Sequence, residues 1–309
     1  MNTENKVTIF AVPKPFVGHI GVIQRNALGS WKAQGTHCRV ILMGDESGTA
    51  ETATEFGVEH IPHIARNESG TPLLNSIFDE ARRASHSRIL CFINFDIMLL
   101  ANLVELISRI RFKTYLMVGR RYNINIKEPW KFDEKNWSTK LIHLVAQVGE
   151  IQPDCAIDYF IFTRDLFHVI PEFAIGRVGY DNWLIYKARS QHVPVIDASQ
   201  VIIAAHQNHE YRHHPDGYQG TREGIEAKTN IDLCGGGQYR GFSIRDSTWV
   251  MSKKGIYRAL SYNYLSRHFD SVPILYPKLK YLIAIVRVVL KPLIKWFRLL
   301  KQKTIRKQE

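Results

Sequence analysis

Cysteine is scarce in this chain, and its four residues lie far apart. Cys38, Cys91, Cys155 and Cys234 form no CxxC pair, so no closely spaced metal-binding or redox motif is present. Cys38 and Cys91 fall within strand-like apolar runs and are interpreted as small core residues. Few, widely spaced cysteines of this kind fit a protein that is kept in a reducing cytosol.

Low-complexity tracts and internal repeats are also absent from the 309 residues. The opening MNTENKVTIF lacks a charged region, an apolar stretch and a small-residue cleavage site, so we expect no signal peptide. The apolar fraction of 45% is that of an ordinary globular protein. The length suits one large α/β domain or two smaller ones.

The body of the chain has little excess charge, although the whole carries +12. Residues 278–309 contain ten Lys or Arg and one acid, so residues 1–277 carry 12 − 9 = +3. We therefore expect two parts, a domain over residues 1–265 and a basic tail over 266–309.

Within this tail, residues 280–303 predict a basic amphipathic helix. Arg287, Lys291, Lys295 and Arg298 recur every three or four residues among apolar side chains. The charges are too frequent for a bilayer span. We expect the helix to lie on an anionic membrane surface, which makes the protein cytoplasmic and membrane-peripheral. A helix docked on the protein's own surface is the alternative, and the wide apolar face argues against nucleic acid.

Short apolar runs alternate with helical patterns through the first 118 residues. The pattern predicts strands at 7–12, 38–43, 58–61, 89–93 and 114–118, and helices at 20–34, 49–56, 71–85 and 101–112. Thr71 is the expected N-cap of the third helix, with Pro72 at its first position. The alternation predicts an α/β fold in which helices cover both faces of a mostly parallel central sheet.

The periodicity weakens after Gly119. Residues 120–150 are expected to form a loop or an insertion that shapes a second wall of the site, and residues 206–241 a loop. Between and after them we expect strands at 156–162, 193–196, 201–205 and 242–251, and a helix at 182–190.

One carboxylate interrupts the apolar run RILCFINFDIMLL, which spans residues 88–100. Burying Asp96 there is costly unless cations or hydrogen-bond donors meet it. In open parallel sheets, ligands bind beyond the carboxyl ends of the strands. Asp45-Glu46 and Asn94-Phe95-Asp96 both follow predicted strands, so we expect a binding site there.

Several stretches together resemble one family. ILCFINFDIMLL, with its DxD-like element, CAIDYFIF, FAIGRVGYDNWLIYKARS and VIDASQVIIAAHQNHEY are similar to nucleotide-sugar glycosyltransferases of the GT-A fold, in a family-2-like branch. The resemblance spans residues 7–251. It implies transfer of a sugar from a nucleotide-sugar donor to a hydroxyl of a glycan or lipid-linked acceptor, with Mn²⁺ or Mg²⁺ bridging the diphosphate and the protein.

The resemblance also implies roles for individual residues. Donor contacts are implied for Asp45, Arg66, Asn67, Asn94 and Asp96. Asp96 and His206 would hold the metal, and Asn94 replaces the first Asp of the usual motif, which removes one negative charge. Asp181 would be the catalytic carboxylate, which favours inversion, although a retaining enzyme could also place an acid there. Asp158, Trp183 and His209 are acceptor candidates, and His209 is also the second choice for the metal after His206.

Each of these residues also has a structural interpretation. Asp45 is an ordinary turn residue, Asp181 a good N-cap, and Asp158 a partner for a core Arg. The segment HQNHEYRHH, with His206, His209, His213 and His214, has zinc-like HxxH spacing or is a solvated loop. Trp130, Trp137 and Tyr180 could stack on sugars, but large aromatics more often pack in cores.

Two other functions remain open from the sequence. Nucleotidyl transfer to a sugar phosphate would use the same fold, but residues 13–18, PKPFVG, contain a single glycine where a phosphate loop would be rich in it. A non-catalytic, membrane-associated scaffold would explain the loss of a carboxylate at Asn94.

Overall fold

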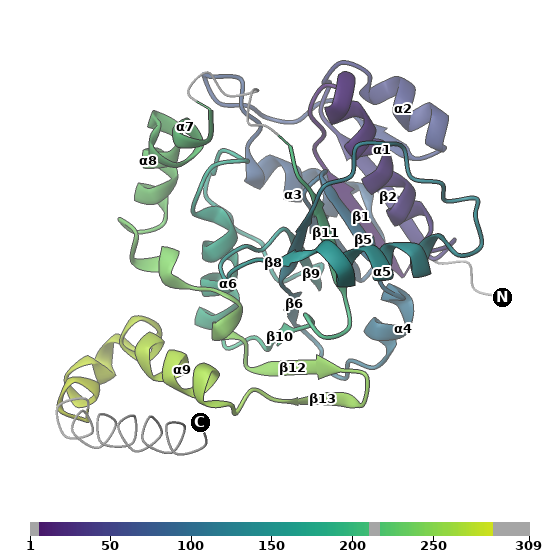
Figure 1. The fold of residues 1–309 in the computed structure, drawn as a ribbon. Helices are drawn as coiled ribbons and strands as arrows, with labels where there is room; N and C mark the ends of the chain where they lie inside the picture. The colour runs from purple at the N-terminus through teal and green to yellow at the C-terminus, as the bar shows by residue number, and fades with distance from the viewer. Residues whose placement is uncertain (1–5, 210–216, 287–309) are drawn as a thin grey trace. The chain divides into compact units, whose positions relative to one another are not determined.

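The computed structural model describes residues 6–209 and 217–286 (Figure 1). The chain divides into two compact units, Met1–Ala259 and Leu260–Glu309. The first unit contains all of the described strands and every residue of the predicted site.

The first unit is built on a nine-stranded sheet in the order β13-β12-β10-β6-β9-β4-β1-β2-β3. Its strands are β1 (Val7–Ala11), β2 (Cys38–Met43), β3 (Glu59–Ile61), β4 (Ile89–Ile93), β6 (Leu116–Val118), β9 (Tyr159–Thr163), β10 (Val195–Asp197), β12 (Trp249–Ser252) and β13 (Gly255–Arg258). Most neighbours pair in parallel, whereas β9 runs antiparallel to both β4 and β6, and β13 runs antiparallel to β12. The expected mostly parallel α/β sheet is confirmed.

A second sheet of four strands has the order β5-β11-β7-β8. Its strands are β5 (Ile97–Leu100), β7 (Arg121–Ile124), β8 (Glu150–Ile151) and β11 (Ile203–Gln207). The chain passes from β4 of the large sheet into β5 of the small sheet through residues 94–96. The two sheets therefore meet at the predicted site.

The helices of the first unit connect these strands. They are α1 (Gly18–Lys32), α2 (Thr49–Phe56), α3 (Leu74–Ala84), α4 (Leu103–Ser108), α5 (Trp137–Val148), α6 (Tyr180–Ser190), α7 (Gly217–Glu223) and α8 (Ile225–Leu233), with short 3₁₀ turns η1 (Gln238–Gly241) and η2 (Ile244–Asp246).

Side-chain alternation along the strands explains why helices cover both faces of the large sheet. Ile9 and Cys91 belong to a buried cluster that includes Trp31 of α1. Neighbouring residues point to the other face, where Phe78 of α3 stacks on Phe162 with ring centroids 5.2 Å apart. The expected cover on both faces is confirmed, and Cys91 is a buried core residue as predicted.

Several local predictions were wrong. Residues 120–150 hold β7, α5 and β8, and residues 206–241 hold α7 and α8, so neither is only a loop. The third helix begins at Leu74 with Leu73 as N-cap. Thr71 and Pro72 precede it because the bridges Arg66–Pro72 and Leu73–Ala174 keep this segment extended.

The second unit contains α9 (Tyr262–Leu275) and the turn η3 (Pro277–Leu279), and residues 280–286 are helical. Most of the predicted basic helix falls on residues 287–309, which lie outside the described residues. Of the helices that the structure describes, none is long and apolar enough to cross a membrane.

Candidate functional site

Strand pairing in the small sheet brings the predicted metal residues together. Asp96 lies between β4 and β5, and β11 runs antiparallel to β5 with His206 opposite Ile97. Backbone and side-chain nitrogens of Gln207 both donate to the Asp96 carbonyl, at 3.0 and 3.3 Å. The end of β11 is thus fixed against the segment that leads into β5.

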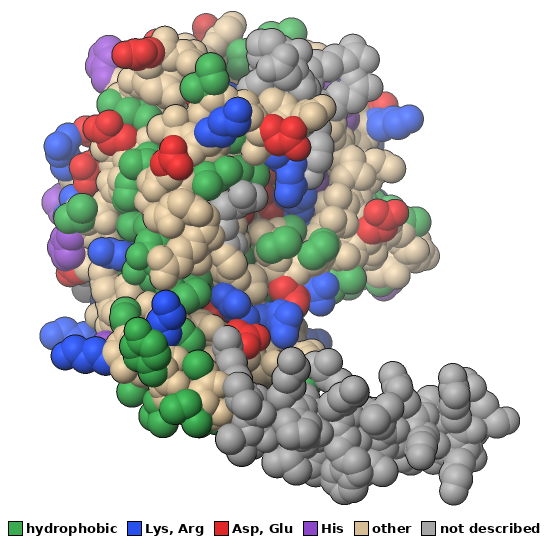
Figure 2. Space-filling model, turned by 90° about the vertical axis from the view of Figure 1, so that its left-hand side faces the viewer, with side chains coloured by type: hydrophobic (Ala, Val, Ile, Leu, Met, Phe, Trp, Pro, Cys, Tyr) green, Lys and Arg blue, Asp and Glu red, His purple; other side chains and the backbone are tan. Residues whose placement is uncertain are grey.

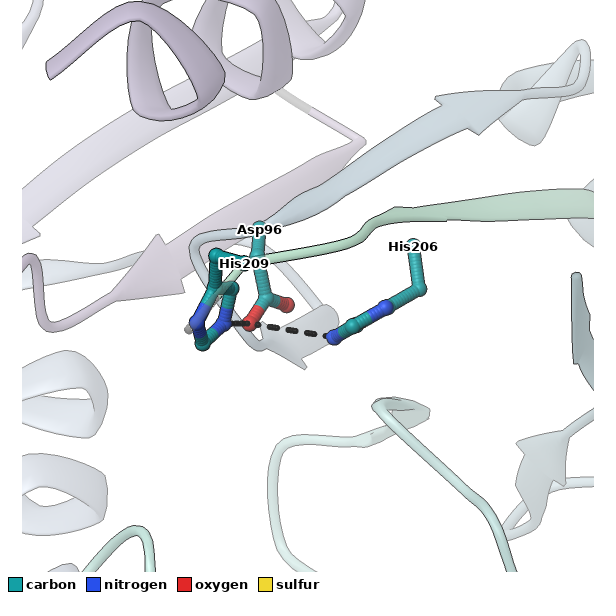
Figure 3. Close-up of side chains that lie close together, drawn as sticks. All are labelled: Asp96, His206 and His209. Atoms are coloured by element: carbon teal, nitrogen blue, oxygen red, sulfur yellow. Dashed lines mark hydrogen bonds and ion pairs between the residues drawn. The ribbon is translucent and has the colours of Figure 1, made fainter. Parts of the chain in front are cut away.

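Two imidazoles face the Asp96 carboxylate from different sides (Figure 3). His209 Nε2 lies 3.0 Å and His206 Nε2 3.5 Å from the same oxygen, Oδ2 of Asp96. The three side chains have potential ligand atoms within 4.8 Å of one another. In the described part of the chain, no other group of three such residues converges in this way.

The electrostatics of this cluster favour a bound cation. Burial would raise the pKa of Asp96, but His206 and His209 outweigh it and hold that pKa well below its usual range. Burial would lower the pKa of His206, but the Asp96 charge raises it overall. Buried Asp96 Oδ1 and His206 Nδ1 find no hydrogen-bond partner among the described residues. A carboxylate and two imidazoles fit a divalent transition-metal ion.

The cluster lines a cavity of about 480 Å³ at the carboxyl ends of β1 and β4. Five cationic side chains line the same cavity: Lys14, Arg66, Arg121, Arg177 and Arg222. Burial lowers the pKa of the Lys14 ammonium, Asp96 partly offsets this, and Arg177 adds to the lowering. Four carboxylates line it as well: Glu46, Asp96, Asp158 and Asp181. The lining therefore has a small excess of basic side chains, and with a cation at the histidine cluster it would suit an anionic ligand. Acidic and basic side chains are also interspersed over the described face of the surface in Figure 2.

Asp181 lines the cavity from the first turn of α6. Its predicted N-cap position was wrong, because Gly179 is the N-cap and Asp181 is the second helical residue. Gly179 has φ of 114°, a conformation that favours glycine. Burial raises the pKa of Asp181 to about 6, and the Asp158 charge adds to this. A carboxyl group with this pKa is suited to accept a proton near neutral pH.

Asn94 and Asp158 both line the cavity and contact each other. Asn94 Nδ2 donates to Asp158 Oδ1 at 2.6 Å, and Arg121 Nη1 donates to Asp158 Oδ2 at 2.7 Å. Asp158 thus has the arginine partner that a buried carboxylate requires.

Of the three residues expected to contact the donor from the β2 and β3 side, Arg66 alone is among the described residues that line the cavity. Arg66 lines it, but its guanidinium already donates to Asp45 and Glu46 at 2.7 and 2.9 Å. Asn67 donates to Glu226 of α8 at 2.6 Å. Among the described residues that line the cavity, Glu46 is present, whereas Asp45 and Asn67 are not.

The aromatic acceptor candidates divide into two buried residues, Trp183 and Tyr180, and two half-buried ones, Trp130 and Trp137. Trp183 is 6% exposed and packs on Phe173 with centroids 5.3 Å apart, outside the described lining of the cavity. Trp130 and Trp137 pack against a second buried cluster. Tyr180 does line the cavity. His213 and His214 lie outside the described residues.

Sequence reasoning missed Lys14, Arg121, Arg177 and Gln207. Lys14 follows β1, and its position in Pro-Lys-Pro at a strand end was an available signal. Arg177 lies four residues before Asp181 and is held by Glu226 at 2.5 Å. Arg121 and Gln207 reach the site only through the pairing of the small sheet, which no local pattern reveals.

No family model matches this chain, and no curated protein matches it in sequence. Solved structures similar in fold include glucosyl-3-phosphoglycerate synthase from Mycobacterium tuberculosis with Mg²⁺ and UDP, at 14% identity and TM-score 0.43, covering 75% of this chain and 80% of that chain. Another is the mannosyltransferase PcManGT from Pyrobaculum calidifontis with GDP-Man and Mn²⁺, at 11% identity and TM-score 0.41, covering 65% and 56%. A third is S. aureus TarS 1-349 with UDP, at 13% identity and TM-score 0.30, covering 39% and 36%.

Proposed function

We propose that this protein is a GT-A-type glycosyltransferase that uses a nucleotide-sugar donor and a divalent cation. The observation that carries the proposal is that the Asp96–His206–His209 cluster and the half-buried Asp181 line one cavity beyond the strands of a mostly parallel sheet. Sugar transfer from a nucleotide donor needs both features, a cation for the diphosphate and a base for the acceptor hydroxyl.

Asp96, His206 and His209 would hold Mn²⁺ or Mg²⁺. Two nitrogen donors favour Mn²⁺ of the two, because Mg²⁺ prefers oxygen ligands. When bound, the cation would neutralise charge on the departing diphosphate. Lys14 and Arg177 line the cavity with the cluster and would bind the same phosphates.

Asp181 would act as the general base. Its carboxylate takes the proton of the acceptor hydroxyl while the hydroxyl oxygen bonds to the anomeric carbon of the donor sugar. The bond from that carbon to the diphosphate oxygen breaks, and the nucleoside diphosphate leaves. A single displacement of this kind inverts the anomeric configuration.

The test is donor turnover with a panel of UDP, GDP and TDP sugars in the presence of Mn²⁺. We expect release of nucleotide that depends on Mn²⁺ and is lost in Asp96→Ala, whereas the exposed-site variant Asp133→Asn keeps it. Release of pyrophosphate from a nucleoside triphosphate and a sugar phosphate would indicate nucleotidyl transfer instead. If no nucleotide sugar binds or raises the melting temperature with Mn²⁺ present, the transferase proposal fails.

We also propose that the C-terminal segment binds an anionic membrane surface, at the cytoplasmic face, and that the acceptor is a lipid-linked glycan. Its described part supports this with Tyr281, Leu282 and Ile285, whose exposed fractions are 81, 56 and 63%. These apolar side chains follow Lys278 and Lys280 closely in the sequence. Flotation with phosphatidylglycerol vesicles should be lost when residues 278–309 are removed, and equal flotation of both forms would contradict this.

A further inference from the structure

The strand register places Asp158 directly beside Asn94. β4 and β9 are antiparallel, and Ile93 pairs with Tyr159, so the next residues along each strand are Asn94 and Asp158. The Asn94 backbone N–H donates to the Asp158 carbonyl at 2.9 Å. Its side-chain Nδ2 donates to Asp158 Oδ1 at 2.6 Å. Two hydrogen bonds of different kinds therefore fix this pair.

The Asp158 carboxylate is buried and ion-paired. Its side chain is 7% exposed, and the partner Arg121, at 18%, comes from β7 of the small sheet. The charge of Asp158 also helps to raise the pKa of the His206 imidazole, after the larger effects of burial, Asp96 and Arg121. Asp158 therefore influences the Asp96–His206–His209 cluster electrostatically, although it is not one of its three potential ligands.

We propose that Asp158 carries the negative charge that is missing at Asn94 and positions the Asn94 amide for the cation site. The Asn94 NH₂ group donates a hydrogen bond to Asp158. The carbonyl oxygen of the same amide is then the atom that would interact with a ligand in the cavity. The site thus keeps two carboxylates, Asp96 and Asp158, although the Asn94-Phe95-Asp96 element has only one. The cation part of this inference rests on the proposed function, whereas the charge placement does not.

This arrangement makes a counterintuitive prediction. Asn94→Asp would restore the usual acidic pair in the motif, but it would put a second carboxylate against Asp158 Oδ1 in a buried place. Like charges at this distance cannot both ionise without a large penalty. We expect Asn94→Asp to lower the melting temperature by roughly 5 °C, more than Asn94→Ala, which removes the amide but adds no charge.

The exchange variant, Asn94→Asp combined with Asp158→Asn, should recover stability. The amide introduced at position 158 can donate to the carboxylate introduced at position 94 and accept from Arg121, so every polar partner is retained. The experiment measures the melting temperatures of Asn94→Asp, Asn94→Ala and the exchange variant in EDTA. Asn136→Asp, at the exposed N-cap position of α5, is the control for an added charge. Titration with MnCl₂ alone then gives the metal affinity of each.

We expect wild type and the exchange variant to have the highest melting temperatures. Asn94→Ala should melt at a lower temperature, and Asn94→Asp at the lowest. Asp158→Asn alone should bind Mn²⁺ roughly tenfold more weakly, and the exchange variant should regain most of that affinity. The inference is overturned if Asn94→Asp is as stable as Asn94→Ala, or if the exchange variant is no better than Asn94→Asp. If wild type binds no Mn²⁺, the proposed metal site fails, and the melting temperatures still decide the charge placement.

Discussion

Replacing Asp181 with asparagine should stabilise the protein and at the same time remove its activity. Burial raises the pKa of this carboxyl from 3.8 to about 6, so the folded state holds the ionised form at a cost. Each pKa unit corresponds to about 1.4 kcal/mol, which gives roughly 2–3 kcal/mol for Asp181. The asparagine has no charge to desolvate, and its carbonyl oxygen can still accept from the Asn182 N–H, now 2.9 Å from the carboxylate.

The sign of this effect depends on pH. Because the folded pKa lies above the unfolded one, the wild-type free energy of unfolding decreases as pH rises from about 4 to about 6 and stays low above that. The gain from Asp181→Asn should therefore be small near pH 4 and complete by pH 8. For a domain of this size it corresponds to roughly 4–8 °C in melting temperature.

The assay is thermal unfolding of wild type and Asp181→Asn in EDTA at pH 4, 6 and 8, beside donor transfer at pH 8. Asp232→Asn, on the exposed end of α8, is the control for loss of one carboxylate. Transfer should fall by at least about 100-fold, and wild-type kcat/KM should decrease below pH 6, as the base is protonated. An Asp181→Asn protein that is less stable at pH 8, or as active as wild type, would refute the assignment of Asp181 as a desolvated base.

Other predictions follow from the same structure. His209→Ala should weaken Mn²⁺ binding by at least roughly tenfold in calorimetric titration, whereas His143→Ala, on the exposed side of α5, should not; equal affinities would remove His209 from the site. Gly179→Ala should lower stability by about 1–3 kcal/mol in denaturant unfolding, because its φ is 114° and a Cβ would lie 3.1 Å from Cys234 Sγ. Phe78→Ala should cost about 3–5 kcal/mol in the same assay, and a loss under about 1 kcal/mol would contradict its place in the aromatic core.

The sequence predicted the large sheet well because its strands are buried on both faces and are therefore continuous apolar runs. It could not reveal that β9 runs antiparallel, since strand direction leaves no mark on composition. The helix α5 was missed because only Leu141 and Val145 among its residues are buried, which gives a weak apolar stripe.

The site was predicted in part. Asp96, His206 and Asp181 could be picked out from the sequence, because strand ends and helix starts have local signals. The structure places all three along one cavity. His209 was expected as the second choice for the metal, after His206, or on the acceptor side. It lies nearer to Asp96 than His206 does, and its role stays a prediction. The partnership of Asn94 with Asp158 depends on the register of β4 and β9, which a single sequence does not contain.

The passage of the chain from β4 to β5 has a consequence for assembly. Asp96 follows a strand of the large sheet, whereas His206 and Arg121 belong to strands of the small one. A chain that has folded only its large sheet would therefore lack His206 beside Asp96 and could not form the proposed cation site. We expect cation binding to report on the completion of both sheets, and not on the large sheet alone.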